Sequence, residues 1–368
     1  MRPVVTRPFV MRLVLERRSS VSVKLLILSP LVAVALTVVA GAAMFAALGH
    51  DPWQALHTYF ILPLSDSWGL QEVAVKATPL ILIAVGLALC YQSNNWNIGA
   101  EGQFLMGAIA GGGIAIATHG VTNGPWLIPV MLLGGALGGA LLALIPALLK
   151  TRFGANEILT SLMLVYAVGY LLDWLVRGPW RDPDGFNMPQ TVTFEPEATM
   201  PLLFGEGRLN LGTPIALLVV LVAAVLVART LKGFEIRLVG EAPRAARFAG
   251  FNDKKLTITV FLISGALAGL AGVIEAAGTI RQLQPSISPG YGFTAIIVAF
   301  LGRLNPIGCL VAGIFLAITF IGGENAQISL RLPLDATRVI QGMLLFFVLA
   351  CDSLVAYRVR LVSRESAA

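Results

Sequence analysis

The stretch LLILSPLVAVALTVVAGAAMFAALG, residues 25–49, carries no charged side chain. A helix needs about 20 predominantly apolar residues to cross a bilayer, and the core of a cleaved signal peptide has only about 7 to 15. We therefore expect this stretch to remain as a membrane anchor. It follows a basic leader, residues 1–24, with these cations: Arg2, Arg7, Arg12, Arg17, Arg18 and Lys24.

The composition of the whole chain supports a membrane protein. Of 368 residues, 57% are hydrophobic and 12% are charged, with a mean hydropathy of +0.81. Soluble domains carry about 25% charged residues. Repeated apolar runs therefore predict an all-α, polytopic helical bundle, because helices satisfy their own backbone hydrogen bonds in lipid.

Including the first run, about ten membrane spans are predicted, and one of them is short. The other nine cover residues 73–91, 98–119, 125–149, 157–177, 211–230, 256–280, 291–302, 305–322 and 337–357. The predicted transmembrane domain therefore extends over residues 25–357, and a tail follows at 358–368.

Basic residues predict the orientation, since Lys and Arg accumulate in cytoplasmic segments. Basic residues predominate among the charges of four segments: the leader, 150–152, 229–255 and the tail. In the 178–210 segment most of the charged residues are acidic. We expect both termini in the cytoplasm of a bacterial inner membrane protein and 178–210 as an external loop. The net charge of +6 then reflects topology, so no nucleic-acid partner is implied.

Two segments interrupt the pattern of whole spans. They are YQSNNWNIGAEGQF, residues 91–104, and RQLQPSISPGYGFTAIIVAFLGRLNP, residues 281–306. They occupy comparable positions in the two halves of the chain, as the broken helices at the central site of a transporter do. Because the corresponding spans run in opposite senses, an inverted repeat is predicted.

The first interrupted segment supplies candidate site residues. If residues 94–104 are helical, Asn94, Asn97 and Glu101 share one face, and Gln103 lies on an adjacent one. These polar groups are costly against lipid, so we expect them to line a translocation path or a gate. The alternative is a polar turn in which Glu101 is a solvated cap.

Small residues predict close helix packing. GGALGGA at 134–140 and SGALAGLAG at 264–272 include the pair Gly265 and Gly269, in the G-x-x-x-G spacing that lets helix backbones approach. We expect these faces to pack inside the protein, with a subunit interface as the alternative.

Catalytic and metal sites are not predicted. The three histidines are scattered, the three cysteines lie in separate apolar segments, and no metal-ligand or nucleophile motif occurs. There is also no G-x-x-x-x-G-K-[ST] loop, so any use of ATP requires a partner. We therefore expect a transport subunit that is not an enzyme and binds no cofactor itself.

Three motifs carry a resemblance to a known family. NIGAEGQ at 97–103, ANEILTSLML at 155–164 and the segment from Gly240 to Gly278 resemble the permease subunits of bacterial ABC importers. The similarity is to the nucleoside-type branch of the simple-sugar and branched-chain amino-acid permease family, over roughly residues 70–355. One departure is Val165, where that branch usually has asparagine.

The resemblance implies a set of partners. They are a cytoplasmic ABC ATPase that hydrolyses the ATP, a second permease subunit, often a paralogue, and a periplasmic or lipoprotein substrate-binding protein. A helix predicted over residues 241–251, within the cytoplasmic segment 231–255, suits docking in the ATPase. Its candidate coupling residues are Glu241, Ala242, Ala245, Ala246, Ala249 and Gly250. The alternative is a basic loop that binds lipid headgroups.

The predicted function is a permease for a small polar solute, a nucleoside or nucleobase. The remaining candidates for contact with a flat solute are aromatic: Trp96, Phe104, Tyr291 and Phe293. Simple sugars and branched-chain amino acids stay open as substrates. An ion-coupled secondary transporter, with Glu101, Asp173 and Glu275 as proton carriers, is the rival from another class.

Overall fold

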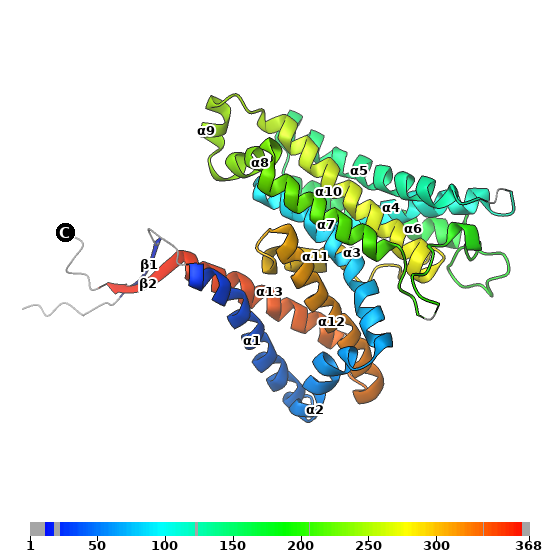
Figure 1. The fold of residues 1–368 in the computed structure, drawn as a ribbon, viewed down its shortest axis with the longest axis horizontal. Coiled ribbons are helices and arrows are strands. Elements are labelled where there is room, and N and C mark those ends of the chain that lie inside the picture. Colours follow the sequence, from blue (N-terminus) through cyan, green and yellow to red (C-terminus); the bar gives the residue numbers. More distant parts are fainter. Residues whose placement is uncertain (1–11, 18–22, 122–123, 206, 334, 363–368) are drawn as a thin grey trace, which may run out of the picture. The chain divides into compact units, whose positions relative to one another are not determined.

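The computed structural model describes residues 12–17, 23–121, 124–205, 207–333 and 335–362. Contacts divide the chain into two compact units. One unit consists of Met1–Pro52 together with Arg338–Ala368, and the other of Trp53–Thr337. Figure 1 shows that helices make up almost all of both units.

The helices follow the hydropathy of the sequence closely. They are α1 (Val23–Ala47), α2 (Pro52–Leu56), α3 (Ser67–Gln92), α4 (Ala100–Thr118), α5 (Leu127–Phe153), α6 (Glu157–Arg177), α7 (Gly212–Arg229), α8 (Leu231–Glu241), α9 (Pro243–Phe248), α10 (Asp253–Ile274), α11 (Tyr291–Leu301), α12 (Pro306–Leu330) and α13 (Asp335–Ala356). Short π and 3-10 turns are η1 (His57–Ile61), η2 (Leu62–Leu64), η3 (Pro196–Ala198) and η4 (Glu275–Ile280). Within the described residues, nine helices are long and apolar enough to span a membrane, and α11 is a shorter apolar helix. The prediction of about ten spans with one short one is confirmed.

The smaller unit holds α1, most of α13 and a short β-ladder. Strands β1 (Arg12–Arg17) and β2 (Tyr357–Val362) pair antiparallel, with Arg12 opposite Val362. The basic segments predicted as leader and tail thus meet through their backbones. This ladder is a local addition to an otherwise helical chain.

Helix α3 is the central helix of the larger unit. Its N-terminus is capped by Asp66, whose carboxylate accepts a hydrogen bond from the Gly69 N–H at 2.7 Å. Nearly the whole helix is buried, and α7, α10, α11 and α12 pack around it. Beyond its exposed first turn, with Trp68 and Leu70, this helix presents most of its side chains to other parts of the protein.

Helices α4, α5 and α10 pack side by side through glycine (Figure 1). A Cβ on Gly269 of α10 would collide with the backbone of Gly135 and Gly139 on α5, and a Cβ on Gly107 of α4 would collide with Gly269. The small-residue motifs therefore pack inside one chain, as expected.

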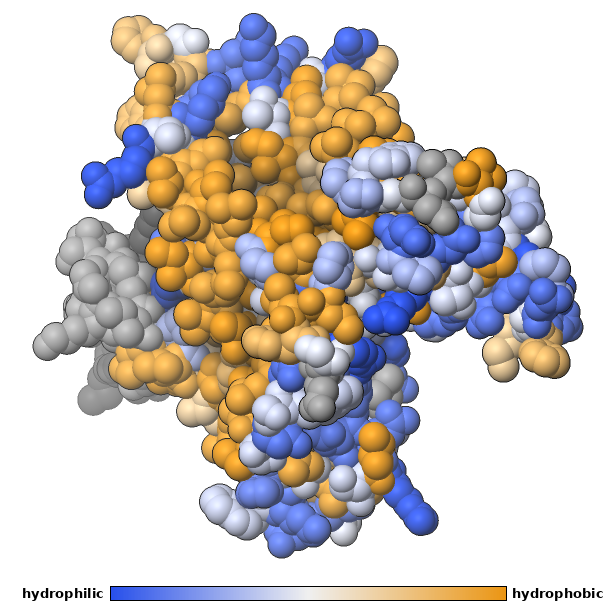
Figure 2. Space-filling model, turned by 45° about the vertical axis from the view of Figure 1, so that its right-hand side comes forward, coloured by the Kyte–Doolittle hydropathy of each residue, from blue (hydrophilic) through white to orange (hydrophobic). Residues whose placement is uncertain are grey.

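The outer helices present apolar side chains. Leu133, Leu137 and Leu141 form a stripe at four-residue spacing on α5, and each is more than 60% exposed. In Figure 2 hydrophobic side chains cover most of the middle of the face shown, and hydrophilic ones gather toward its rims. Lipid is the solvent that suits such a surface.

Candidate functional site

The first interrupted segment is an irregular turn between α3 and α4. Residues 93–99 have no helical structure, and Asn94 has a left-handed backbone with φ of 56°. The predicted shared face of Asn94, Asn97 and Glu101 is therefore wrong. The Tyr91 hydroxyl donates to the Asn97 carbonyl at 3.0 Å, and this bond holds the turn in its non-helical course.

Buried amides lock this turn to its neighbours. Asn97 Nδ2 donates to Gln103 Oε1 at 2.9 Å, and Gln103 Nε2 donates back to Asn97 Oδ1 at 3.0 Å. Asn97 Nδ2 also donates to Ser264 Oγ on α10 at 3.1 Å. Asn97 is 0% and Gln103 1% exposed, so these two predicted path residues are satisfied by protein groups.

Glu101 joins the two interrupted segments. Its Oε2 accepts a hydrogen bond from the Gly292 N–H at 2.6 Å. An acceptor at this place satisfies an unpaired donor of the first turn of α11 and opposes the positive end of its dipole. Glu101 is 7% exposed, so it caps a neighbouring helix instead of a solvated turn.

The predicted aromatic residues separate into an inner and an outer group. Phe104 and Tyr291 are both 0% exposed, with ring centroids 5.7 Å apart, and Phe320 extends the contact at 5.8 Å from Tyr291. Trp96 is 37% and Phe293 41% exposed. Trp96 packs against Tyr91 at 5.3 Å and donates from Nε1 to Asn94 Oδ1 at 3.1 Å, so Trp96 and Asn94 lie together at the end of α3.

A charged cluster that the sequence analysis missed lies beside Tyr291. Lys76 Nζ is 3.2 Å from a carboxylate oxygen of Glu324 and 5.8 Å from the centroid of the Tyr291 ring. The Tyr291 hydroxyl donates to Glu275 Oε1 at 3.3 Å, and the Thr279 hydroxyl donates to Glu275 Oε2 at 3.2 Å. Lys76 inside the apolar run 73–91 was the available signal, since a cation within a span is costly and marks function.

A second ion pair connects the loop before α7 to the same part of α3. Arg208 Nε donates to Glu72 Oε1 at 2.8 Å, and Arg208 Nη2 donates to Glu72 Oε2. The hydrogen-bonded Glu72 carboxylate raises the pKa of Arg208. Glu72 lies one helical turn before Lys76, so the two charges of α3 share one side of the helix. Glu72 pairs with Arg208 of the 178–211 segment, the loop between α6 and α7, whereas Lys76 pairs with Glu324 of α12.

The predicted helix over residues 241–251 is wrong in its bounds. Helix α8 ends at Glu241, Ala242 is non-helical with φ −141° and ψ 69°, and α9 covers only Pro243–Phe248. A residue before proline is disfavoured in the α-helical region, which explains the break at Ala242. Gly250, with φ of 85°, follows α9 as expected for a residue that ends a helix.

The candidate coupling residues do not form one outer face. Ala246 is 1% exposed and packs inward, Ala242 is half-buried, and the remaining four are exposed: Glu241, Ala245, Ala249 and Gly250. Phe248 of α9 is 97% exposed and was not among the candidates. Gly240 lies against the Gln92 carbonyl, so α8 touches the end of α3.

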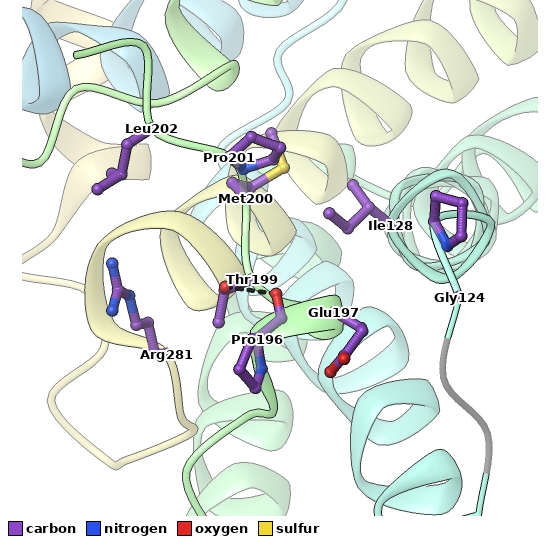
Figure 3. A pocket seen from close by; sticks show the side chains of 10 residues that line it. Gly124, Ile128, Pro196, Glu197, Thr199, Met200, Pro201, Leu202 and Arg281 are labelled. Carbon is purple, nitrogen blue, oxygen red and sulfur yellow. Dashed lines mark hydrogen bonds between the residues drawn. The ribbon is translucent and has the colours of Figure 1, made fainter. Parts of the chain in front are cut away.

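Two surface depressions lie away from the Glu101 junction. One, of 690 Å³, lies between the start of α5, the end of η4 and the 196–202 segment, where the Thr199 hydroxyl donates to the Pro196 carbonyl at 2.8 Å (Figure 3). The other, of 600 Å³, includes Asn94, Arg237 and Arg303. Among the described residues, no group of three or more His, Cys, Asp or Glu residues could hold a metal ion.

A family model described as branched-chain amino acid transport system / permease component matches residues 69–349. The chain belongs to this permease family. It is 35% identical to the glucose ABC transporter permease protein TsgB13 of Haloferax volcanii, over 94% of this chain and 93% of that one. It is 28% identical to the nucleoside ABC transporter permease protein NupB of Lactococcus lactis (88% of this chain, 90% of that one) and 29% identical to the guanosine ABC transporter permease protein NupP of Bacillus subtilis (88% and 92%).

The matches confirm the predicted family and its sugar and nucleoside permease branch, and the chain is a multi-pass membrane protein. Val165, which stands where the family branch usually has asparagine, lies in α6. Val165 is 6% exposed, and a Cβ on Gly102 of α4 would meet the Val165 backbone. This position therefore contacts the helix that begins at Ala100.

Proposed function

We propose that the chain is the membrane subunit through which an ATP-driven importer passes a nucleoside or a simple sugar. The observation that carries the proposal is the similarity to glucose, guanosine and nucleoside permeases over 88% or more of this chain. The two nucleoside-type relatives favour a nucleoside, and the glucose permease at 35% identity favours a sugar. The meeting of both interrupted segments at Glu101 and Gly292 supports a central transport site.

Uptake into proteoliposomes holding the complete transporter tests this proposal. A panel of guanosine, a nucleobase, ribose, glucose and leucine is offered with ATP inside, and in parallel with only an imposed Na⁺ or H⁺ gradient. We expect ATP-dependent uptake of a nucleoside or a sugar. Uptake of leucine alone would contradict the substrate assignment, and gradient-driven uptake without the ATPase would favour a secondary transporter.

We propose that α8 and α9 bind the partner ATPase. Support comes from Phe248, which is 97% exposed at the end of α9, and from the exposed arginines Arg244 and Arg247 beside it. An exposed aromatic ring on a short helix offers a large area for burial in a partner groove. Ala246 faces inward, so a bulky charge there would disturb the permease itself.

The substitution Phe248→Asp tests the docking role. We expect it to reduce co-purification of the ATPase and ATP-driven uptake at least tenfold, with the permease still in the membrane. Phe186→Asp is the matched control, because Phe186 is also 97% exposed but lies in the 178–211 segment. If Phe248→Asp keeps the ATPase, or Phe186→Asp loses it equally, the docking assignment fails.

We also propose that both termini and the α8–α9 segment face the cytoplasm, with 178–211 outside. The basic and acidic distribution of these segments supports this orientation. Cysteines introduced singly at the exposed positions Asp184 and Arg244 test it, and the natural Cys90, Cys309 and Cys351 are all buried. An impermeant thiol reagent should label position 184 from outside and position 244 only after lysis. Labelling of both from one side would refute the topology.

The remaining partners are also proposals. A second permease subunit, a paralogue or another copy, would complete the path, and a substrate-binding protein would deliver the solute to the 178–211 side. The family of the chain supports this assembly. Co-purification of each subunit from cells expressing the whole transporter, with and without the Phe248→Asp change, measures which contacts depend on α9.

A further inference from the structure

The Lys76–Glu324 pair is unusual for its place in the chain. Lys76 lies in α3 and Glu324 in α12, both apolar helices long enough to span the membrane. The Lys76 side chain is nevertheless 17% exposed and that of Glu324 44% exposed. These two side chains therefore place partly exposed charges on helices that are mostly apolar.

Lipid does not suit this surface. A charged residue in the middle of a membrane helix costs about 2.5 to 3.5 kcal/mol on insertion scales, so such residues face water-filled cavities or protein. The pair lies beside α11, the short helix of the second interrupted segment, because Lys76 is over the Tyr291 ring. The side of α3 and α12 that carries the pair is therefore suited to water or to another polar partner, and not to lipid.

The other charges of the cluster are committed to protein groups. Glu72 accepts two hydrogen bonds from Arg208, and Glu275 accepts one each from the Tyr291 and Thr279 hydroxyls. Lys76 and Glu324 meet through an ammonium with three donors and a carboxylate with several acceptor sites. A contact of 3.2 Å uses only part of this capacity.

The chemistry of the pair fits a hydroxyl group. A hydroxyl donates one hydrogen bond and accepts others, so it can bind a carboxylate and an ammonium together. Three carboxylates and two cations gather here, which nearly balances the local charge and favours a neutral solute over an ion. The buried Tyr291 ring lies below Lys76 and packs against the Phe320 ring, so apolar rings support the pair from the protein side.

We propose that Lys76 and Glu324 form a solute-contact site that binds hydroxyl groups of a neutral sugar or of the ribose of a nucleoside. This inference rests on the proposed function and deepens it, because it names the part of the solute that the permease recognises. A nucleobase without its sugar has no such hydroxyl groups. The site therefore predicts discrimination by the permease against solutes that lack them.

The experiment compares hydroxylated solutes with their mono-deoxy forms in the complete transporter. The solute transported best by the wild type, such as guanosine or glucose, and each of its deoxy analogues are supplied at concentrations that saturate the binding protein. Initial uptake is measured for the wild type, Lys76→Met and Glu324→Gln. Membrane abundance and ATPase co-purification show whether each variant is assembled, and Glu324→Gln keeps the side-chain shape if Lys76→Met does not fold.

We expect both variants to slow uptake of the hydroxylated solute about tenfold and to bring at least one ratio of hydroxylated to deoxy uptake close to one. The control Arg177→Met, which breaks an exposed ion pair on α6, should leave all ratios unchanged. If both assembled variants keep the wild-type ratios of hydroxylated to deoxy uptake, the proposed contact site is wrong. Full recovery of uptake and ratios in the doubly swapped Lys76→Glu, Glu324→Lys protein would also overturn it, because a simple ion pair would then suffice.

The two proposals fail in different ways. If the wild-type transporter moves no sugar or nucleoside, the proposed function is wrong, whatever the variants do. If the wild type moves such a solute and the variants keep its hydroxyl discrimination, only the contact site is wrong.

Discussion

Two regions of the larger unit differ in what is added to close packing at glycine. Helices α4, α5 and α10 meet through glycines whose neighbours leave no room for a Cβ. Helix α11 also approaches the backbone of α4 through a glycine, Gly292, but there the Gly292 N–H donates to the Glu101 carboxylate. The Tyr291 hydroxyl of α11 also donates to Glu275 of the charged cluster. Backbone packing of the first kind has no alternative arrangement of similar energy, whereas hydrogen bonds of the second kind can be exchanged for water or solute. The difference indicates a rigid scaffold beside a junction that adds exchangeable hydrogen bonds to close packing.

The largest effect is expected at the glycine contact. Gly269→Leu should abolish folded protein, because the side chain would collide with the backbones of Gly135 and Gly139 and overpacking costs about 1 to 3 kcal/mol even where side chains can shift. The measurement is the yield of monodisperse protein in detergent and its thermal midpoint. Gly169→Leu on α6 is the control, since a Cβ there has no neighbour within 4 Å. Equal yields of the two variants would show that the scaffold is less rigid than described.

The next effect is expected at the junction. Glu101→Ala should lower transport several-fold at near-normal abundance, because α11 loses an acceptor bonded to the Gly292 N–H, a contact of about 1.5 to 3 kcal/mol for a charged partner. Glu101→Gln keeps an acceptor oxygen and should retain most of the transport. Uptake of Glu101→Ala equal to wild type at equal membrane abundance would contradict a role for this junction in transport.

A smaller effect on stability is expected when the reciprocal hydrogen bonds between Asn97 and Gln103 are removed. Gln103→Leu leaves the Asn97 amide without its reciprocal partner and should lower the free energy of unfolding by about 1 to 3 kcal/mol. Denaturation in detergent measures it, with uptake recorded in parallel. Loss of uptake without loss of stability would instead indicate that Gln103 contacts the solute, as the sequence predicted.

The smallest effect is expected on the surface of α6. Asp173 pairs with Arg177 one turn later at 2.8 Å, and both side chains are substantially exposed, so Asp173→Asn should change stability by less than about 0.5 kcal/mol. Uptake should also stay at the wild-type level. A strong loss of transport would revive the prediction of Asp173 as a proton carrier and weaken the contrast between surface and junction.

Much of the fold could be predicted from the sequence because hydropathy acts over whole spans. The apolar runs 157–177 and 211–230 differ by no more than one residue at either end from α6 and α7. The glycine motifs also predicted internal packing, since close backbone contact requires residues without side chains. The two interrupted segments were recognised from their polar, glycine and proline residues, and the structure joins them at Glu101.

The contacts within the site could not be predicted because they depend on distant residues. Asn97 leaves the helix through its bond to Tyr91, and it is buried by Gln103 and Ser264, which no local periodicity reveals. The role of Lys76 depends on Glu324, far along the chain. The break at Ala242, by contrast, was available from Pro243, whose effect on the preceding residue is local.

Gly240 lets α8 contact the backbone at the end of α3 directly. With no side chain between them, α8 bears directly on the Gln92 carbonyl, and the Gln92 side chain in turn donates to the Leu304 carbonyl in the turn before α12. A displacement of α8 would therefore act on the α3 backbone directly, because no side chain at position 240 lies between the two helices. It acts on the end of α3, whose cation Lys76 lies about 24 Å further along the axis, at 1.5 Å per residue, beyond the proline Pro79.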